Sequence, residues 1–328
     1  MPPLPFAPRP LAGEGLSSWV ARLAVHNFVT PADFWTWLGC DDVHDLTLDD
    51  GLLDRLSGST RLVVNELHRR FAPEPATKAA PLAVSWPCAI RGAACPACCR
   101  AAAQDDRDHF VLASSGSLWR FSCPEHRVRL ASLDGYGMVL QDGRARFVRE
   151  GSSIGIGGTG LTAQPAGLAL AFEDAISRVL GGQPPGPEWR PRTAASFLAC
   201  VAVLIDIVLW RRGNGVAFAH EFDQLRISGS ETLSLGLHDQ RRGAALLNDQ
   251  GPRNRMNVFA ALAVLLARPL ACDHPFAVYM DWDRSDRSGL FDYFIGGFDE
   301  LQRAVIAERL RGWPDCIATP ARRALHIS

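Results

Sequence analysis

The sequence predicts a mainly α-helical protein with one small β hairpin between an amino-terminal and a carboxyl-terminal helical part. Apolar residues recur at the spacing of amphipathic helices on both sides of the segment 85–150. That segment holds five of the nine cysteines. The chain has 328 residues, of which 47% are apolar and 21% charged, so it is long enough for more than one domain and too apolar to be disordered.

A proline-rich arm opens the chain, and a first helix follows it. The arm lacks the basic and apolar regions of a signal peptide, so we expect an extended segment. The helix begins at 16–18 with a serine cap. Its apolar stripe is formed by Leu16, Trp19, Val20 and Leu23. Arg22 falls on the other face of this helix.

A second helix is predicted to begin at Thr30-Pro31. Threonine caps the free N–H groups, and proline suits the first helical position. Gly39 can end this helix. Its apolar stripe is expected to be Phe34, Trp37 and Leu38.

Two further helices, at 50–57 and 60–71, are separated by Gly58. Helix, tight turn and helix form the outline of a helix-turn-helix, whose second helix reads DNA. The polar side of that helix would offer base and phosphate contacts from Arg61, Asn65, His68 and Arg69. The pattern is equally typical of a helical hairpin with a solvated face, and the segment is net acidic, so both interpretations stay open.

Charge gives no general signal for nucleic-acid binding. The chain has 34 basic and 35 acidic side chains, and no segment carries the strong positive excess that drives tight non-specific DNA binding. Any contact with DNA must therefore come from a local patch.

The cysteine-rich segment contains two chelating pairs. They are formed by Cys95, Cys98, Cys123 and His126. Each pair has a two-residue spacer, and two such turns can complete the tetrahedron that zinc prefers. We therefore predict one structural Zn²⁺ ion, with no open position for catalysis. Cys88 or Cys99 stays open as a replacement ligand.

The 24 residues between the pairs leave room for a hairpin. Its strands would be the apolar segments 110–112 and 118–121, so the two pairs would flank a zinc ribbon. A redox role for the cysteines is disfavoured because a thioredoxin-like motif needs a βαβ setting. The expected domains are 1–84, helical and helix-turn-helix-like; 85–150, the zinc ribbon; and 151–328, a helical carboxyl-terminal domain.

The carboxyl-terminal part is expected to contain four helices, at 166–180, 192–211, 253–268 and 298–311. The apolar run from Ala194 to Trp210 contains Asp206 and is shorter than the roughly 20 residues that span a bilayer, so we expect no membrane span. The glycine-rich segment 151–160 lacks the lysine of a phosphate-binding loop, and 281–289 lacks the closing glutamate of a calcium loop.

No nucleophile motif, paired carboxylates or acidic triad appears in a catalytic setting, so we expect a protein that is not an enzyme. Clustered thiols without a secretory leader are typical of a reducing, cytoplasmic environment.

Several motifs occur together in one order. They are Leu16-Ser17-Ser18-Trp19 with Arg22 and Leu23, Asp45-Leu46, Cys95-Pro96-x-Cys98, Trp119-Arg120, and Cys123-Pro124-x-His126. In this order, over about residues 10 to 135, the chain resembles the TniQ family of transposition proteins. It departs from many members in having no second Cys-x-x-Cys within 127–150.

The resemblance implies a helix-turn-helix, a zinc ribbon and a mostly helical remainder. It also implies a non-catalytic adaptor in DNA transposition, which helps select the target and connects it to the transposase and its ATPase partner. Some relatives bind a DNA site, and others form homodimers that dock on an RNA-guided complex. The alternative is a zinc-containing helix-turn-helix transcription regulator with a helical sensor half.

Overall fold

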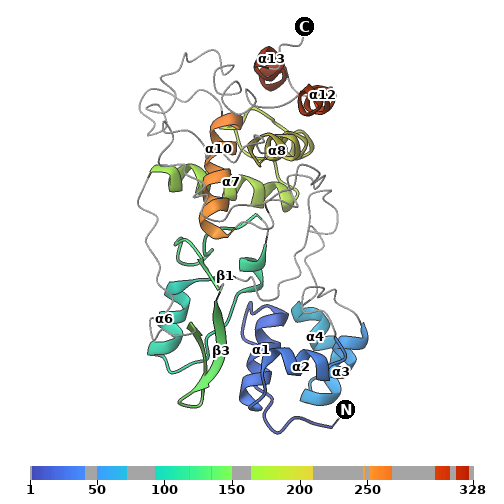
Figure 1. Cartoon of the computed structure of the whole chain (residues 1–328), viewed down its shortest axis with the longest axis vertical. Helices are drawn as coiled ribbons and strands as arrows, with labels where there is room; N and C mark the ends of the chain where they lie inside the picture. The colour runs from blue at the N-terminus through green and yellow to red at the C-terminus, as the bar shows by residue number, and fades with distance from the viewer. Residues whose placement is uncertain are drawn as a thin grey trace. The chain divides into compact units, whose positions relative to one another are not determined.

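The computed structural model of the chain describes part of each region. The described residues are 2–40, 50–71, 93–117, 119–133, 135–149, 164–209, 247, 251–267, 300–310 and 315–324. The chain divides into two compact units (Figure 1). The first unit contains 1–78 and 85–160, and the second contains 79–84 and 161–328. The expected domain boundaries, after residues 84 and 150, lie outside the described residues.

Four short helices form the amino-terminal part of the first unit. They are α1 Leu16–His26, α2 Pro31–Trp37, α3 Asp50–Thr60 and α4 Val64–Phe71. The helices lie together in Figure 1, in shades of blue, around a shared core. Its largest members are Trp19, Leu23, Phe34, Trp35 and Leu53. The apolar stripe predicted for α1 is thus confirmed in the core, whereas the predicted serine cap is wrong, because Gly15 precedes the helix and no side chain caps it.

The second helix begins as predicted but buries a different tryptophan. The Thr30 hydroxyl accepts a hydrogen bond from the Asp33 N–H at 3.1 Å, and Pro31 is the first helical residue. Gly39 follows the helix with φ of +73°, a conformation that glycine adopts without steric cost. Trp35, not Trp37, is buried: the two residues are two positions apart, so their side chains point about 200° apart around the helix.

The break between the third and fourth helices lies further along the chain than Gly58. The α3 helix continues through Gly58 to Thr60, and a turn at 61–63 precedes α4. Ser59 does not cap α4; its hydroxyl donates to the Arg55 carbonyl one turn back at 2.7 Å. Arg61 opens the turn with φ of +60°. Glycine alone was therefore a poor marker of the turn, since an isolated glycine is tolerated inside a helix at a cost of about 1 kcal/mol.

The cysteine-rich part contains short β elements around one helix. The elements are β1 Ala93–Ala94, α6 Pro96–Gln104, a 3₁₀ turn η1 Ala113–Gly116, β2 Ala131–Ser132, β3 Tyr136–Gln141 and β4 Arg144–Arg149. Two antiparallel pairs form, β1 with β2 and β3 with β4. Ala94 lies opposite Ala131, and Tyr136 lies opposite Arg149.

The predicted hairpin between 110–112 and 118–121 is wrong. In the described part of these segments, Leu112 instead forms an antiparallel bridge with Glu14. The Gly15 N–H donates to the Val111 carbonyl at 2.9 Å, and the Ala113 N–H donates to the Gly13 carbonyl at 2.8 Å. The backbone hydrogen bonds of this apolar segment are therefore made with the residues just before α1, about 100 positions earlier in the chain.

The β3–β4 hairpin turns at Asp142-Gly143. Both residues have positive φ, +50° and +73°, as a two-residue type I′ turn requires. One face of the hairpin packs on α1, where Met138 and Ala145 contact Val25. Helix α1 therefore contacts helical neighbours on one side and the hairpin on another.

The outer edge of β4 is covered by the loop that follows α6. The His109 N–H donates to the Ala145 carbonyl at 2.9 Å, and the Phe147 N–H donates to His109 Nδ1 at 3.2 Å. Burial lowers the pKa of His109 to about 4, and the nearby Arg146 charge adds to this shift. The imidazole is therefore neutral at pH 7 and can accept the hydrogen bond from the strand.

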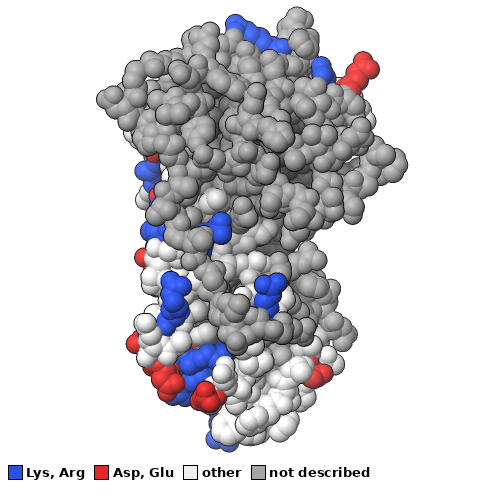
Figure 2. Space-filling model, turned by 60° about the vertical axis from the view of Figure 1, so that its left-hand side comes forward, with Lys and Arg blue, Asp and Glu red and all other residues white. Residues whose placement is uncertain are grey.

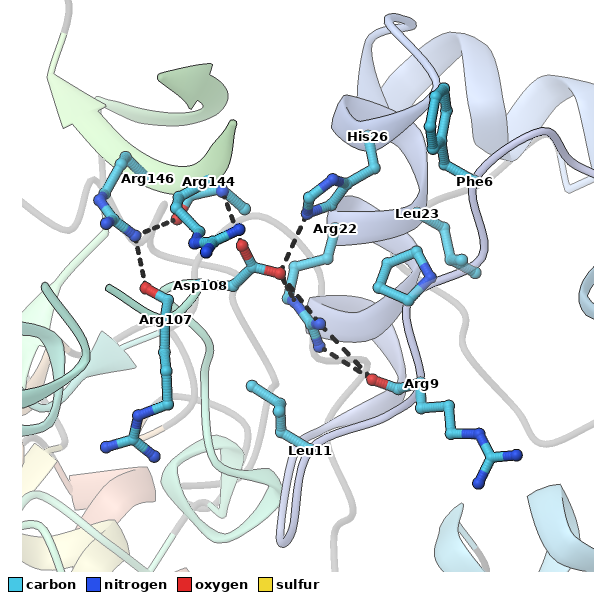
Figure 3. Close-up of polar contacts among 12 residues, drawn as sticks. Phe6, Arg9, Leu11, Arg22, Leu23, His26, Arg107, Asp108, Arg144 and Arg146 are labelled. Atoms are coloured by element: carbon cyan, nitrogen blue, oxygen red, sulfur yellow. Dashed lines mark hydrogen bonds and ion pairs between the residues drawn. The ribbon is translucent and has the colours of Figure 1, made fainter. Parts of the chain in front are cut away.

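A buried ionic network joins α1 to the hairpin (Figure 3). Arg22 is 3% exposed and lies 2.6 Å from a Glu14 carboxylate oxygen and 3.0 Å from Asp108 Oδ2. Asp108 also contacts His26 Nε2 at 3.0 Å and accepts from the Ala145 N–H at 2.9 Å. The face of α1 that carries Arg22 is thus buried and polar.

The two carboxyl groups of this network titrate in opposite directions. Burial raises the pKa of Glu14 by more than Arg22 and its hydrogen bonds lower it. Burial also acts to raise the pKa of Asp108, but the Ala145 N–H, Arg22 and His26 outweigh it, and the net shift is downward. Asp108 is therefore the carboxylate whose ionised form the fold favours.

The second unit is helical and has an aromatic core. Its helices are α7 Gln164–Leu180, α8 Ala194–Leu209, α10 Pro252–Leu266, α12 Glu300–Arg309 and α13 Asp315–Ala324. The Phe172 ring lies 5.1 to 6.2 Å from the rings of Phe197, Phe259 and Trp189. The four predicted helices are confirmed, and α13 was not predicted. No helix among the described residues is long and apolar enough to cross a membrane.

We predict that Asp108→Asn lowers the free energy of unfolding by about 2–4 kcal/mol at pH 7, because Arg22 then lacks one of its two carboxylate partners while remaining buried. The folded-state pKa of Asp108 lies below its unfolded value, so this stability is present above about pH 4 and is lost as the pH falls through the folded pKa. Chemical denaturation at several pH values measures the effect.

The control is Asp105→Asn. Asp105 pairs with Arg107, but its side chain is 58% exposed, so the expected change is within about 0.5 kcal/mol. If the two variants lost the same unfolding free energy at pH 7, the stabilising role assigned to the buried Asp108–Arg22 pair would be wrong.

Candidate metal centre and helical binding surface

The first pair of candidate ligands lies at the start of α6. Cys95 caps the helix, and its Sγ accepts a hydrogen bond from the Cys98 N–H at 3.4 Å. Pro96 occupies the first helical position, which it favours because its missing N–H has no partner there. Because Cys98 lies in the first turn, the local helix start holds both thiols on one side.

The second pair lies on a tight turn. The Cys123 N–H donates to the Val128 carbonyl, and the Arg127 N–H donates to the Cys123 carbonyl, both at 2.9 Å. Arg127 has φ of +51° within this turn. Ser122 and Arg129 form an antiparallel bridge directly behind it.

The two turns are brought together by a pair of strands that lie before the first turn and after the second turn in the sequence. The β1 strand immediately precedes Cys95, and its partner β2 follows the second turn. In the sequence, both candidate ligand pairs therefore lie between β1 and β2. The hairpin that was predicted would have lain between the two ligand pairs.

The four predicted ligands form one cluster. Cys95, Cys98, Cys123 and His126 place their ligand atoms within 4.8 Å of one another. His126 Nδ1 lies 3.7 Å from Cys95 Sγ, 3.4 Å from Cys98 Sγ and 3.6 Å from Cys123 Sγ. The Sγ atoms of Cys98 and Cys123 are 3.8 Å apart.

These spacings fit a tetrahedral metal centre. Metal–sulfur bonds of about 2.3 Å and a metal–nitrogen bond of about 2.0 Å separate tetrahedral ligand atoms by about 3.5–3.8 Å. The side chains therefore lie as they would around one ion, and the cluster could hold a metal.

The surroundings of the cluster are apolar on one side and open on the other. Cys95 and Cys123 are buried with Ala93 and Leu130, whereas His126 is exposed. Burial, together with the neighbouring thiolates, raises the pKa of Cys98. A metal that binds here must displace thiol protons, so its affinity is expected to increase with pH.

The neighbouring cysteine is not part of the cluster. Cys99 is buried against Ala94, Val111 and Leu133, and burial followed by the Cys95 charge raises its pKa to about 12. The thiol of Cys99 therefore belongs to the apolar core of this part of the chain. Cys88, the other candidate replacement, lies outside the described residues.

The structure separates the four predicted DNA-binding residues. Arg61 lies in the turn between α3 and α4, whereas Asn65, His68 and Arg69 lie on α4. Arg61, Asn65 and Arg69 are exposed, and His68 is partly buried. Arg69 Nε donates to the Asn65 carbonyl at 3.3 Å. Three of the four side chains are therefore open to solvent.

Acidic side chains accompany other exposed arginines. Arg144 lies 2.8 Å from Asp106, and Arg107 pairs with Asp105. Among the coloured residues of Figure 2, basic side chains form separate groups, and acidic side chains lie directly beside one of them. Arg107 and Arg144 thus form local ion pairs with carboxylates of the loop after α6.

Sequence reasoning missed the roles of several residues around α1. Ser18 Oγ donates to Glu14 at 3.1 Å and accepts from the Val111 N–H at 2.9 Å. Trp19 Nε1 donates to the Pro8 carbonyl at 2.8 Å. The available signal was a serine and an arginine at helical spacing, four residues apart, on the side of the helix away from the apolar stripe.

The described part of the first unit is therefore a helical module packed on a small module whose Cys/His cluster could hold a metal ion. Residues 5–130 match the family model of TniQ, which confirms the resemblance over these residues. The match covers less than half of the chain and ends before residue 161, where the larger segment of the second unit begins. No curated protein and no solved structure matches the chain.

We predict that purified protein contains about one metal ion per chain, by elemental analysis, because one four-ligand cluster is described. His126→Ala and Cys95→Ser should lose the ion and lower the melting temperature, since binding and folding of such small sites are coupled.

Cys99→Ala is the matched control. It changes a thiol in the same helix that lies outside the cluster, so the variant should retain its metal. Metal-free protein with the melting temperature of the metal-bound form would contradict a structural role for the cluster.

Proposed function

We propose that the protein is a non-catalytic, TniQ-like adaptor in DNA transposition, which helps select a target site and recruits the transposase and its ATPase partner. The observation that supports this most directly is the TniQ match over 5–130. The match includes the helix that carries Arg22 and all four clustered ligands. The proposed partners are DNA, the transposase, the ATPase and, in some settings, an RNA-guided complex or a second copy of the chain.

The metal in the cluster is proposed to be one structural Zn²⁺ ion. Three sulfur atoms and one imidazole nitrogen suit zinc, whereas magnesium and calcium prefer oxygen ligands. Four protein ligands fill a tetrahedral centre, so the ion has no position for a reacting water. Its proposed role is to hold the start of α6 and the turn at 123–126 together in a zinc-ribbon-like module.

The helical surface is proposed to contact DNA through a helix-turn-helix formed by α3 and α4. A three-residue turn joins the two helices, and Arg61 and Arg69 are exposed beside it. No carboxylate among the described residues pairs with either guanidinium, so both are available to phosphate or base edges. This surface supplies the local patch that a nearly neutral chain needs.

We expect deletion of the gene to reduce targeted insertion to background in a cellular transposition assay that supplies the proposed transposase and ATPase partners. His126→Ala should reproduce the loss, because the cluster supports the first unit, whereas Cys99→Ala should retain insertion. Unchanged insertion without the gene, together with binding to promoter DNA, would favour the transcription-regulator alternative.

For DNA contact, Arg61→Gln and Arg69→Gln should each weaken binding to labelled duplex DNA. Each lost phosphate contact should also reduce the slope of log affinity against log salt by about 1. Fluorescence anisotropy at several salt concentrations measures both quantities. Affinities equal to that of the unmodified protein would place any DNA contact outside α4.

A further inference from the structure

The amino-terminal arm is held in place by its own carbonyl groups. The carbonyl of Pro8 accepts from Trp19 Nε1 at 2.8 Å, and that of Arg9 lies 3.4 and 3.5 Å from the two Nη atoms of Arg22. The carbonyl of Pro10 accepts from an Arg70 Nη at 3.1 Å. Three consecutive carbonyls are thus bound by side chains of α1 and α4, and the flanking prolines fix φ at residues 8 and 10.

The main-chain carbonyl and the side chain of Arg9 point in different directions. Figure 3 shows the Arg9 carbonyl directed at the Arg22 guanidinium and the Arg9 side chain extending to the opposite side. The side chain is exposed, and no carboxylate among the described residues pairs with it. The backbone of Arg9 is therefore fixed, while its guanidinium is presented to solvent.

The bound arm lies against the basic end of α4. The last turn of this helix contains His68, Arg69 and Arg70. Because Arg70 binds the carbonyl of Pro10, Arg9 and Arg69 each lie one residue from that contact. Consecutive Cα atoms are about 3.8 Å apart, so the backbones of Arg9 and Arg69 both lie close to this contact.

The arm and the segment 61–71 carry an excess of positive charge, unlike the chain as a whole. In the described residues 2–10 and 61–71 the arginines are Arg9, Arg61, Arg69 and Arg70. The one carboxylate in those ranges, Glu66, lies 3.4 Å from Arg70 and so partly offsets that arginine alone. The guanidinium groups of Arg9, Arg61 and Arg69 remain for an anionic partner.

We propose that Arg9 is a phosphate-binding residue for duplex DNA, and that the fixed arm and the end of α4 together contact the DNA backbone. The inference rests on the proposed DNA contact of α4 and adds the arm as a second contact point. Guanidinium groups bind phosphate oxygens through charge-assisted hydrogen bonds, and phosphate contacts fix the orientation of a helix-turn-helix on its site. A pre-ordered arm loses little conformational entropy when it binds.

Duplex DNA is the partner that this geometry favours. Extended arms beside a DNA-reading helix are known to reach the duplex in other helix-turn-helix proteins. The described patch has arginines on both the arm and the helix, so it can contact phosphates that are separated along the backbone. The exposed aromatic ring of the arm, Phe6, packs edge-on against Phe28, so single-stranded RNA serves as the competing probe in the test.

The experiment compares Arg9→Gln with the unmodified full-length, metal-loaded protein. The probe is a fluorescein-labelled duplex of about 30 base pairs and arbitrary sequence, and anisotropy gives the affinity from about 50 to 200 mM salt. Arg9→Gln should weaken binding about 3- to 10-fold at low salt and reduce the salt slope by about 1. Arg9→Lys, which keeps the charge, should retain the slope.

Two controls separate charge from fold. The melting temperature of Arg9→Gln should be unchanged, because the carbonyl that binds Arg22 is retained. Arg107→Gln removes another exposed arginine, one that already pairs with Asp105, so it should leave the affinity and the slope unchanged.

The outcomes distinguish the two levels of the proposal. If Arg69→Gln weakens binding and Arg9→Gln does not, the role of the arm is overturned while the contact by α4 stands. If the unmodified protein does not bind the duplex, both are overturned. Equal effects of Arg9→Gln and Arg107→Gln, or tighter binding to single-stranded RNA that depends on Arg9, would also overturn the assignment to duplex DNA.

Discussion

The first unit depends on a single buried guanidinium. Arg22 on α1 lies between two carboxylates. Glu14 lies just before α1, and Asp108 lies in the loop after α6. A buried cation is costly unless it is paired and fully hydrogen-bonded, so the arm, the helix and the loop must all take their places around it. Asp108 also accepts a hydrogen bond from the Ala145 N–H, so the position of the hairpin depends on the same ionic network. The helical module and the module with the Cys/His cluster thus share one buried ionic network.

Sequence patterns predicted those features that depend on neighbouring residues. Helix α1, the threonine cap of α2 and the ligand pairs at 95–98 and 123–126 each arise from short-range spacing, and the structure confirms their placement. Features that depend on distant partners were missed. The segment 110–112 resembles a strand but bonds to 13–15, and Arg22 resembles a surface residue until Asp108 is placed beside it.

The β3–β4 hairpin does have a local sequence signal, because Asp-Gly between two alternating segments is typical of a two-residue hairpin turn. Asp142-Gly143 is such a pair. The metal cluster illustrates the opposite limit. Spacing grouped its four side chains, and the structure places them together, but the strand pairing beside them uses only Ala93, Ala94, Ala131 and Ser132. Two-residue strands of small side chains have no periodicity that sequence alone can reveal.

The 86 positions that separate Arg22 from Asp108 have a consequence for synthesis on the ribosome. When α1 leaves the exit tunnel, neither Asp108 nor the hairpin residues that cover its second face have been translated. The early helices can collapse around Trp19, but the polar side of α1 stays hydrated until the chain has been made to about Ala145. The buried ionic network of the first unit therefore forms late in synthesis, after residues far along the chain have been translated.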